Sequence, residues 1–293
     1  MVQEDTIYSL KEASTMLALD ESELQNYIEA KQLRARKTRG AYTVTLSDLW
    51  GLVYELEKGA LVDFYETVLR CSNKERDCPK TRKTPRKVYF QKGFYTEGEP
   101  GKISYMVVAK NPGHPLEAEM NLYWGSNRDM AKTHLYFVRR IFYDPFVKEG
   151  EKQKSNFSGS DRRSLVFHKN LLRYMCWLMD VPESHPDKVK RVFEKTLYTN
   201  LVKCPTHIES GEVLDSVTMD NCFRKHFLRE IDLFSPKVVI ALGREVYNFL
   251  RIGRINIPVV FIKHPSRNFY GPIGSEKETY ELKKMKNEID ALL

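Results

Sequence analysis

The sequence contains no apolar run long enough for a membrane-spanning helix, and its start lacks the charged, apolar and small-residue succession of a secretory signal. Cysteine is scarce, with five in 293 residues, and acidic residues are outnumbered by basic ones, 39 to 47. We therefore expect an intracellular, cytoplasmic protein without membrane contact. Thiols stay reduced there, so metal binding or chance explains the cysteines better than disulfides.

What is present is the composition of a folded protein with a basic surface. Hydrophobic residues make up 42% and aromatic residues 12%, which excludes a disordered chain. The length suits one sizeable α/β domain and a small additional module. The net charge of +8 and pI near 9.1 suit a polyanionic partner, although many soluble proteins are mildly basic.

The first segment has the pattern of two short helices and a hairpin. Apolar residues at helical spacing predict a first helix within residues 7–18, with Ser9 as its candidate N-cap, and a second over 21–31. Residues 32–45 form a predicted hairpin around a turn at Gly40. Ser47 and its neighbours are expected to cap a further helix. Over residues 6–55 this order resembles the winged helix-turn-helix of excisionase and MerR-like regulators. We expect a module at 1–55 followed by a connecting helix at 56–70.

The hairpin carries dense positive charge, from Arg34, Arg36, Lys37 and Arg39. In a winged helix-turn-helix, the second helix would enter the major groove while these side chains meet phosphates. Each neutralised phosphate adds salt-dependent affinity, which favours DNA contact. The alternative is a protein-interaction module whose basic hairpin is merely solvated.

Four cysteines fall into an early pair and a late pair, which can meet only in a folded domain: Cys71, Cys78, Cys204 and Cys222. Four thiolates are what zinc or a [4Fe–4S] cluster requires. The early pair lies in a basic segment, residues 70–92, with nine Lys or Arg against two acids. Cys176 lies in an apolar helical run and is expected to be a core residue.

The segments around the late cysteines are similar to a known family. Thr199–Cys204 reads TNLVKC, residues 236–243 read PKVVIALG, and His264 begins an HPS segment. Together they resemble the uracil-DNA glycosylase superfamily over roughly residues 66–293, most closely the iron–sulfur family 4 enzymes. The resemblance implies a three-layer α/β/α domain with a mainly parallel sheet at 71–293, and the four cysteines as cluster ligands. The early gap is wider than that family's usual two residues.

Two segments at predicted strand ends carry the expected catalytic residues. The strand over residues 103–109 ends in Asn-Pro-Gly, as in the single-strand-selective and mismatch-specific families, where family 4 has an acidic residue. The resemblance implies that Asn111 positions the attacking water, unless it only forms the turn. His264, after the strand 258–262, would donate to the carbonyl oxygen beside the scissile bond and stabilise the departing base.

Further residues are assigned to DNA by the same resemblance. Asn200 would read the Watson–Crick edge of an extruded pyrimidine, since its amide both donates and accepts. Ser266 and Arg267 would contact phosphates, or Arg267 would fill the gap left by the flipped base. Phe146 and Phe167 are both candidates for the ring that stacks on the base. Lys110 lies close enough to leave a lyase step open, although a monofunctional enzyme is favoured.

The substrate is predicted from what is absent beside the first motif. Gly113 stands where some uracil glycosylases place a Tyr against C5, and an insertion around residues 114–166 could reshape the pocket. We therefore expect a monomeric enzyme that excises a modified pyrimidine, such as hydroxymethylated or glucosylated cytosine of phage DNA, in antiviral defence. The alternatives are uracil repair and a non-catalytic iron–sulfur regulator.

Overall fold

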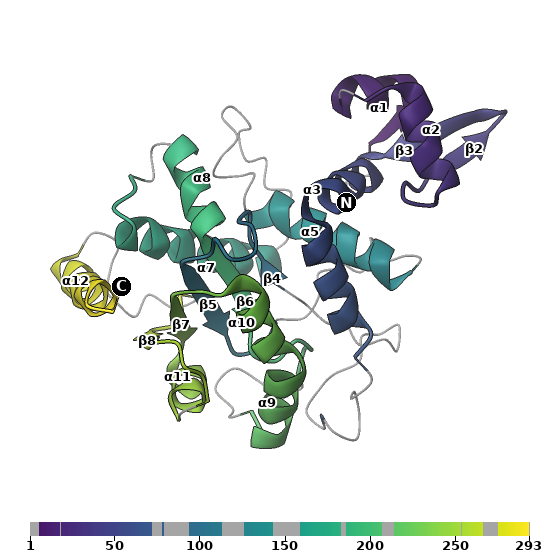
Figure 1. Ribbon diagram of the computed structural model, residues 1–293. Helices are drawn as coiled ribbons and strands as arrows, with labels where there is room; N and C mark the ends of the chain where they lie inside the picture. The colour runs from purple at the N-terminus through teal and green to yellow at the C-terminus, as the bar shows by residue number, and fades with distance from the viewer. Residues whose placement is uncertain are drawn as a thin grey trace. The chain divides into compact units, whose positions relative to one another are not determined.

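The computed structural model describes residues 6–17, 19–71, 78, 94–112, 126–142, 159–182, 186–206, 214–252, 254–265 and 275–292. The chain forms two compact units (Figure 1). Unit 1 consists of Met1–Arg70 and Leu116–Arg140, and unit 2 of Cys71–Pro115 and Ile141–Leu293. Within the described part of the chain, no helix combines the length and apolar composition needed to cross a membrane.

Unit 1 begins with a small sheet and two short helices. Its elements are β1 (Ile7–Ser9), α1 (Leu10–Leu17), α2 (Glu21–Glu29), β2 (Arg36–Thr38) and β3 (Ala41–Thr45), with antiparallel strands in the order β1-β3-β2. Gly40 turns the β2–β3 hairpin at φ +86°, a conformation that favours glycine. The predicted helix pair and hairpin are present around a core of Ala13, Leu24, Leu33, Val44, Leu49 and Leu52.

One long helix, α3 (Leu46–Leu69), follows the hairpin and is kinked at Lys58. The side chain of Thr45 caps its first turn by accepting from the Asp48 amide at 3.2 Å. The cap is therefore Thr45 and not the predicted Ser47. The expected boundary at residue 55 falls inside this helix.

The second segment of unit 1 supplies helix α5 (Asn127–Phe142), which is tied to α3 by ion pairs. Lys132 Nζ binds Glu55 Oε2 at 2.8 Å and the Gln32 carbonyl at 2.9 Å. Arg128 binds Glu55 at 2.6 Å and Asp63 at 2.7 Å. The predicted insertion at 114–166 is thus divided, because residues 116–140 belong to unit 1 and the rest to unit 2.

Unit 2 is built on a five-stranded sheet. Its strands are β4 (Phe94–Tyr95), β5 (Tyr105–Ala109), β6 (Thr196–Asn200), β7 (Val238–Leu242) and β8 (Val259–Ile262), in the order β4-β6-β5-β7-β8. β4 is antiparallel to β6, and the other four strands are parallel. Every residue of β5 and β7 is buried, as expected for central strands covered on both faces.

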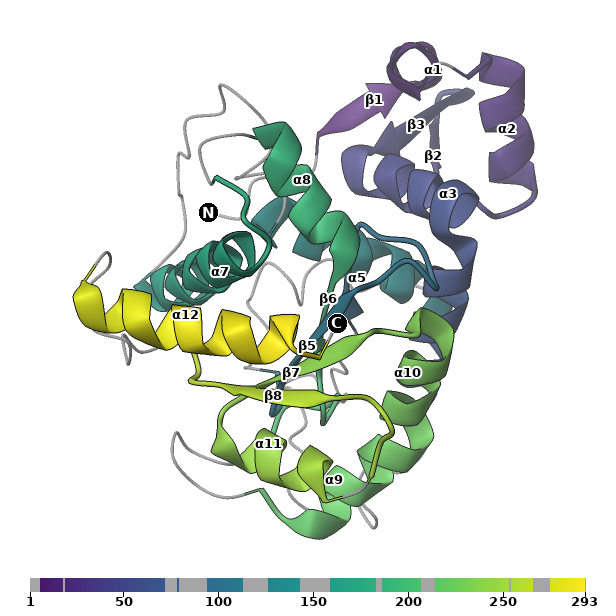
Figure 2. The same ribbon diagram turned by 60° about the vertical axis from the view of Figure 1, so that its left-hand side comes forward.

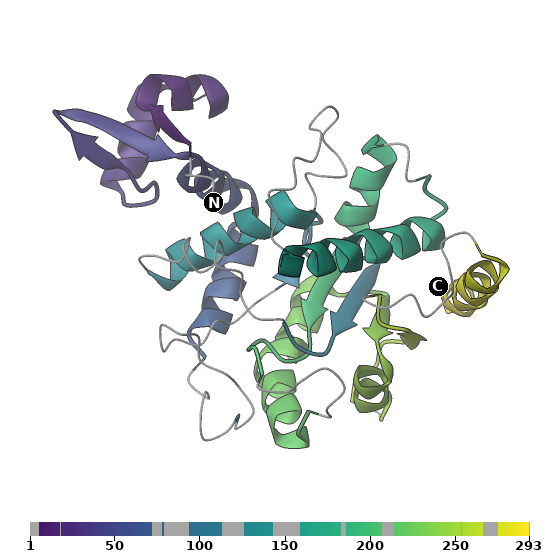
Figure 3. The ribbon, with the colours of Figure 1, turned by 180° about the vertical axis from the view of Figure 1, so that it is seen from behind.

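Helices cover both faces of this sheet, as Figures 1, 2 and 3 show from three directions. One layer holds α7 (Gly159–Leu178), α8 (Pro186–Lys195) and α12 (Glu276–Asp290). The other holds α9 (Ser216–Cys222), a π-helical turn η1 (Phe223–Phe227), α10 (Leu228–Phe234) and α11 (Arg244–Arg251). Helical backbone continues from α9 through η1 into α10, so the helical run begins at Ser216 and Cys222 lies within it, whereas the sequence pattern predicts that Cys222 begins the helix.

The strand order places a topological switch at β5. The connection from β5 to β6 passes through α7 and α8, while that from β6 to β7 passes through α10 in the opposite direction. Right-handed crossovers that run in opposite directions put their helices on opposite faces. Doubly wound sheets bind ligands where the carboxyl ends of such strands diverge.

Candidate active site

The predicted catalytic side chains follow strands at the carboxyl edge of the sheet. Asn111 comes two residues after β5, Asn200 is the last residue of β6, and His264 follows β8. Ala109 is in register with Asn200. Backbone pairing continues past the strands, with the Val202 amide donating to the Lys110 carbonyl at 2.9 Å. The polar residues are thus held at fixed heights along one edge.

Asn111 is half-buried and oriented by a residue that sequence reasoning missed. Its Nδ2 donates to Thr206 Oγ1 at 3.0 Å and to the Pro112 carbonyl at 3.2 Å. Thr206 is buried, two residues after Cys204, and no motif signals it. With its nitrogen engaged, the amide presents its oxygen, and an acceptor is what a water nucleophile needs.

Asn200 is buried, with 4% of its surface exposed. Its Oδ1 is inaccessible and has no hydrogen-bond partner among the residues that the structure describes. Leaving a buried acceptor unsatisfied costs about 1–3 kcal/mol. Such an atom at the ligand-binding edge of a sheet is suited to accept a hydrogen bond from a ligand.

The ring of Phe167 lies beside that of His264. Their centroids are 5.1 Å apart and their planes are inclined by 33°, and Phe167 also meets Tyr198 edge-on at 5.8 Å. Asn170, one turn further along α7, donates to the Pro265 carbonyl at 2.9 Å. Helix α7 thus supports the His-Pro turn. Of the two predicted stacking rings, Phe167 is at this edge, and Phe146 lies outside the described residues.

A buried ion pair holds the end of β6. Lys203 Nζ lies 2.6 Å from Glu230 Oε1, 2.6 Å from the Asn200 carbonyl oxygen and 2.7 Å from Thr199 Oγ1. Lys203 is 1% exposed, and Glu230 on α10 is fully buried. Burial lowers the pKa of Lys203 and raises the pKa of Glu230, while the charge of each opposes the shift of the other. This network, which we name the Lys203 clamp, was not predicted.

Three of the predicted metal-binding cysteines act electrostatically on the fourth, Cys78. Cys78 hydrogen-bonds Cys222, and the charges of Cys204 and Cys71 also act on it. That hydrogen bond and burial raise the pKa of Cys78, while the hydrogen bond from Cys78, opposed by burial, lowers the pKa of Cys222 to about 7. None of the five cysteines, all of which the structure describes, forms a disulfide.

The cysteine cluster has donors of one kind, suited to iron–sulfur or zinc ligation. Cys78, Cys204 and Cys222 are buried and Cys71 is half-buried. Among the described residues, however, no three metal-binding side chains are arranged to hold an ion. Metal binding therefore stays a prediction. Cys176 is 1% exposed in α7, where it packs as a core residue.

The remaining predicted DNA contacts are distributed over both units. Lys110 Nζ pairs with Glu245 Oε2 at 3.1 Å, which joins the segments after β5 and β7 at the topological switch. In unit 1 the four basic residues of the hairpin segment are exposed: Arg34, Arg36, Lys37 and Arg39. Gly113, Ser266 and Arg267 lie outside the described residues.

Unit 2 is a doubly wound α/β domain with a polar site at the carboxyl edge of its sheet, the arrangement of an α/β enzyme. A model of the uracil DNA glycosylase superfamily matches residues 95–287, and the chain belongs to this family. Members of the superfamily are DNA glycosylases, so membership indicates hydrolysis of a glycosidic bond in DNA. No curated protein matches the chain significantly.

Proposed function

We propose that the protein is a monofunctional DNA glycosylase that hydrolyses the N-glycosidic bond of an extruded pyrimidine and leaves an abasic site. The observation that carries the proposal is the unsatisfied Oδ1 of Asn200 at the carboxyl edge of the sheet. A pyrimidine turned out of the stack offers a hydrogen-bond donor on its Watson–Crick edge, which would satisfy this acceptor. The ion pair between Lys110 and Glu245 supports hydrolysis by water over attack by a lysine amine.

Each residue of the site has a distinct role in this reaction. The Asn111 oxygen accepts a hydrogen bond from the attacking water and orients it, while Thr206 holds the amide. His264 donates to the base carbonyl, where negative charge develops as the bond breaks. Phe167 offers a ring face for stacking. The Thr206→Val variant should slow single-turnover base release about tenfold, while Thr206→Ser should retain the rate; equal rates for both variants and the parent would remove this role.

We further propose that the excised base is a modified pyrimidine of phage DNA, such as hydroxymethylated or glucosylated cytosine, with defence as the role. Gly113 supports this in the sequence, because it stands where some uracil glycosylases have a Tyr against C5 and it carries no side chain. Uracil is the competing substrate, favoured by the description of the family.

Single-turnover excision on otherwise identical oligonucleotides separates the two substrates. The set carries uracil, 5-hydroxymethyluracil, 5-hydroxymethylcytosine or glucosylated hydroxymethylcytosine. We expect the parent enzyme to release the modified base. The Asn111→Ala enzyme serves as the inactive control. Robust release of uracil without action on any modified base would reject the defence role and leave the glycosylase assignment standing.

We propose that Cys71, Cys78, Cys204 and Cys222 hold a [4Fe–4S] cluster, with zinc as the alternative. The cluster would act as a structural crosslink and take no part in bond cleavage. Its donors are four thiols that form no disulfide. Cys71 and Cys78 lie at the start of unit 2, Cys204 and Cys222 come from a later part of the chain, and the charges of the other three act on Cys78. Purified protein should be brown, absorb at about 400 nm and contain iron and sulfide, as thiolate-bound clusters do. Colourless protein with stoichiometric zinc would show that the cysteines hold zinc instead.

The N-terminal part of unit 1 is proposed to bind DNA as a winged helix-turn-helix. The exposed basic side chains beside the β2–β3 hairpin support this proposal. A non-catalytic regulator would use the same surface. Asn111→Ala and His264→Ala variants that bind DNA normally but release no base would exclude that reading, whereas unaltered release would exclude the catalytic assignment.

A further inference from the structure

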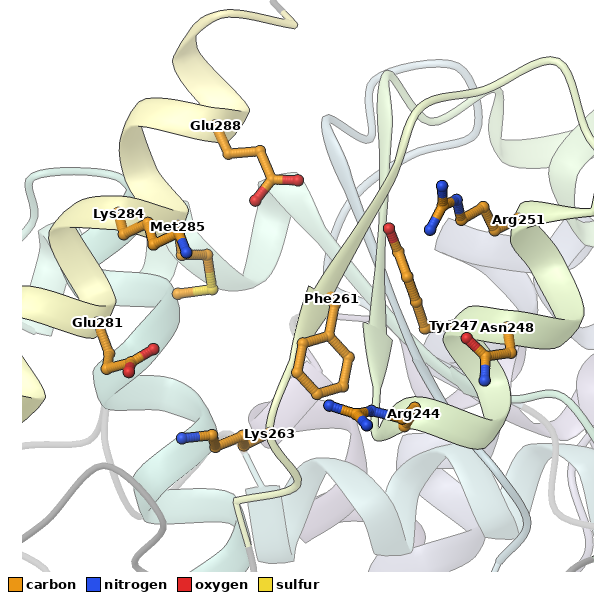
Figure 4. Close-up of a pocket in the computed structure, with 10 residues that line it drawn as sticks. All are labelled: Arg244, Tyr247, Asn248, Arg251, Phe261, Lys263, Glu281, Lys284, Met285 and Glu288. Carbon is orange, nitrogen blue, oxygen red and sulfur yellow. The ribbon is translucent and has the colours of Figure 1, made fainter.

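A cavity of about 520 Å³ runs along β8, the last strand of the sheet, between α11 and α12 (Figure 4). Its size is typical of ligand-binding clefts. We name it the β8 groove, and it is lined by Arg244, Tyr247, Asn248, Arg251, Phe261, Lys263, Glu281, Lys284, Met285 and Glu288. None of Asn111, Asn200 and His264 lines it, so it is a second feature of unit 2.

The groove begins at the catalytic edge of the sheet. Arg244 is the second residue after β7, and Lys263 directly precedes His264. In Figure 4 these two side chains lie near one end of the cavity, while Arg251 and Glu288 lie near the other. A strand of nucleic acid whose base reaches His264 would therefore meet Lys263 within one residue of the site.

Three of the four cationic side chains of the groove are available for a ligand. The groove lining carries four cationic side chains against two carboxylates. Among the described residues, none of Arg244, Arg251 and Lys284 pairs with a carboxylate. The two carboxylates are both on α12 and Arg244 and Arg251 are both on α11, so one wall is basic and the other mixed.

Aromatic rings lie within the basic side of the groove. Tyr247 on α11 and Phe261 on β8 meet edge to face at 5.6 Å, and the Arg251 guanidinium lies 5.7 Å from the centre of the Tyr247 ring. Cations interleaved with aromatic rings are the combination that binds single-stranded nucleic acid, because phosphates meet the charges and bases stack on the rings. The carboxylates opposite can accept from the exocyclic amines of bases, whereas they would repel the closely spaced phosphates of a duplex.

We propose that the β8 groove binds the single-stranded DNA segment that flanks the target nucleotide. Arg244, Arg251 and Lys263 contact its phosphates, and Tyr247 and Phe261 stack against its bases. The inference rests on the proposed function, because it takes the DNA strand at His264 as the starting point. It predicts that unpaired flanking DNA adds affinity without changing the chemical step.

The test measures binding by fluorescence anisotropy with two single-stranded oligonucleotides, one ending beside the target base and one extending past it on both sides. The variants Arg244→Glu and Arg251→Glu are compared with Lys283→Glu, an equal charge change on the exposed part of α12 outside the groove. We expect each groove variant to weaken binding of the long oligonucleotide at least about tenfold. The slope of log K against log salt should also become shallower by about one, which corresponds to the loss of one phosphate contact. The short oligonucleotide and the control should change little.

Equal weakening by all three variants would show a general charge effect and overturn the proposal, as would unchanged affinity in the groove variants. Thermal unfolding of each variant identifies any loss through misfolding, and Tyr247→Leu, which keeps the charges, must also weaken long-oligonucleotide binding. Binding is read without base release. If binding depends on the groove but no base is released, only the proposed function is rejected. If base is released normally but binding does not depend on the groove, only this inference is rejected.

Discussion

At the scale of single residues, unit 2 contains buried polar atoms that have no hydrogen-bond partner among the described residues. Such atoms lower the stability of the fold and are suited to bind a ligand. Asn200 Oδ1 is buried without a described partner, and His226 Nδ1 on the π-helical turn is in the same state. Lys203, by contrast, has its charge fully engaged. This contrast separates side chains whose polar contacts stabilise the fold from polar atoms that have no described partner.

Replacing Asn200 should uncouple stability from activity. In the Asn200→Leu variant an apolar side chain of similar volume removes the unsatisfied acceptor, so the free energy of unfolding should stay level or rise by about 1 kcal/mol. Single-turnover base release should fall by more than about a hundredfold. Urea unfolding and excision assays measure the two quantities. A variant that is destabilised but still releases base would show that Asn200 stabilises the fold and does not recognise the base.

His226 should make stability depend on pH. Burial, followed by the charges of Lys203, Arg229 and Lys225, lowers its pKa in the folded protein to about 3. The ring is then neutral when folded but takes up a proton in the unfolded chain below about pH 6.5. The contribution of His226 to the free energy of unfolding is therefore fully present above about pH 6.5. It is lost as the pH falls toward about 3, by up to about 1.4 kcal/mol per pH unit.

The His226→Gln variant provides the comparison for this effect. Denaturant unfolding between about pH 7 and pH 4 should show a shallower pH dependence in the variant than in the parent, by close to one proton. Identical slopes would mean that His226 is protonated in the folded protein.

At the scale of elements, β6 and its continuation carry most of the site. The strand ends at Asn200, and the Lys203 clamp, which includes the Asn200 carbonyl, links it to α10. The clamp lies between the candidate base-reading residue and Cys204. Loss of either charge would therefore disturb both.

The Lys203 clamp should behave as a coupled pair. Lys203→Met or Glu230→Gln alone leaves a buried charge without its partner and should cost about 3–5 kcal/mol of stability. The double variant Lys203→Met/Glu230→Gln should cost much less than the sum of the two single variants. A double-mutant cycle from urea unfolding measures the coupling; strictly additive losses would show two independent side chains.

Sequence patterns predicted the elements that depend on local or periodic features. The central strands β5 and β7 were predicted because buried parallel strands are continuous apolar runs. The edge strand β8 was predicted from the same kind of run, although only every second residue of it is buried. The hairpin was predicted because Gly40 permits its turn. The predicted end of the helix at Phe234 is confirmed, but its predicted start at Cys222 was wrong, because the helical run begins at Ser216 behind the Asp215 cap. Thr206 and the Lys203 clamp were missed because their partners are distant in sequence and only tertiary packing brings them together.

At the scale of the whole molecule, the division into two units does not follow the order of the chain. Residues 116–140 complete unit 1 although the first catalytic motif precedes them. Apolar periodicity reports that a helix exists, but it does not report which helix it packs against. The partners of Arg128 and Lys132 on α3 were for that reason unpredictable.

A fragment that begins at residue 71 should be less stable than the full chain. Without α3, the buried Lys132 ammonium loses Glu55, and Arg128 loses its carboxylates, so α5 carries unpaired charge. We expect lower soluble yield and faster proteolysis within residues 116–140 than in the full chain. Restored solubility in a fragment that also lacks residues 116–140 would support this cause, whereas equal behaviour of both fragments would contradict it.

The shared construction of unit 1 also affects the order of events during synthesis. A ribosome produces Glu55 long before Lys132, and the whole first motif, including Asn111, is made in the interval. Until α5 emerges, Glu55 and Asp63 of the nascent α3 lack the counter-charges of Arg128 and Lys132. The N-terminal unit therefore matures only after the first catalytic strand has been translated, so the two units acquire their structure in overlapping periods of synthesis.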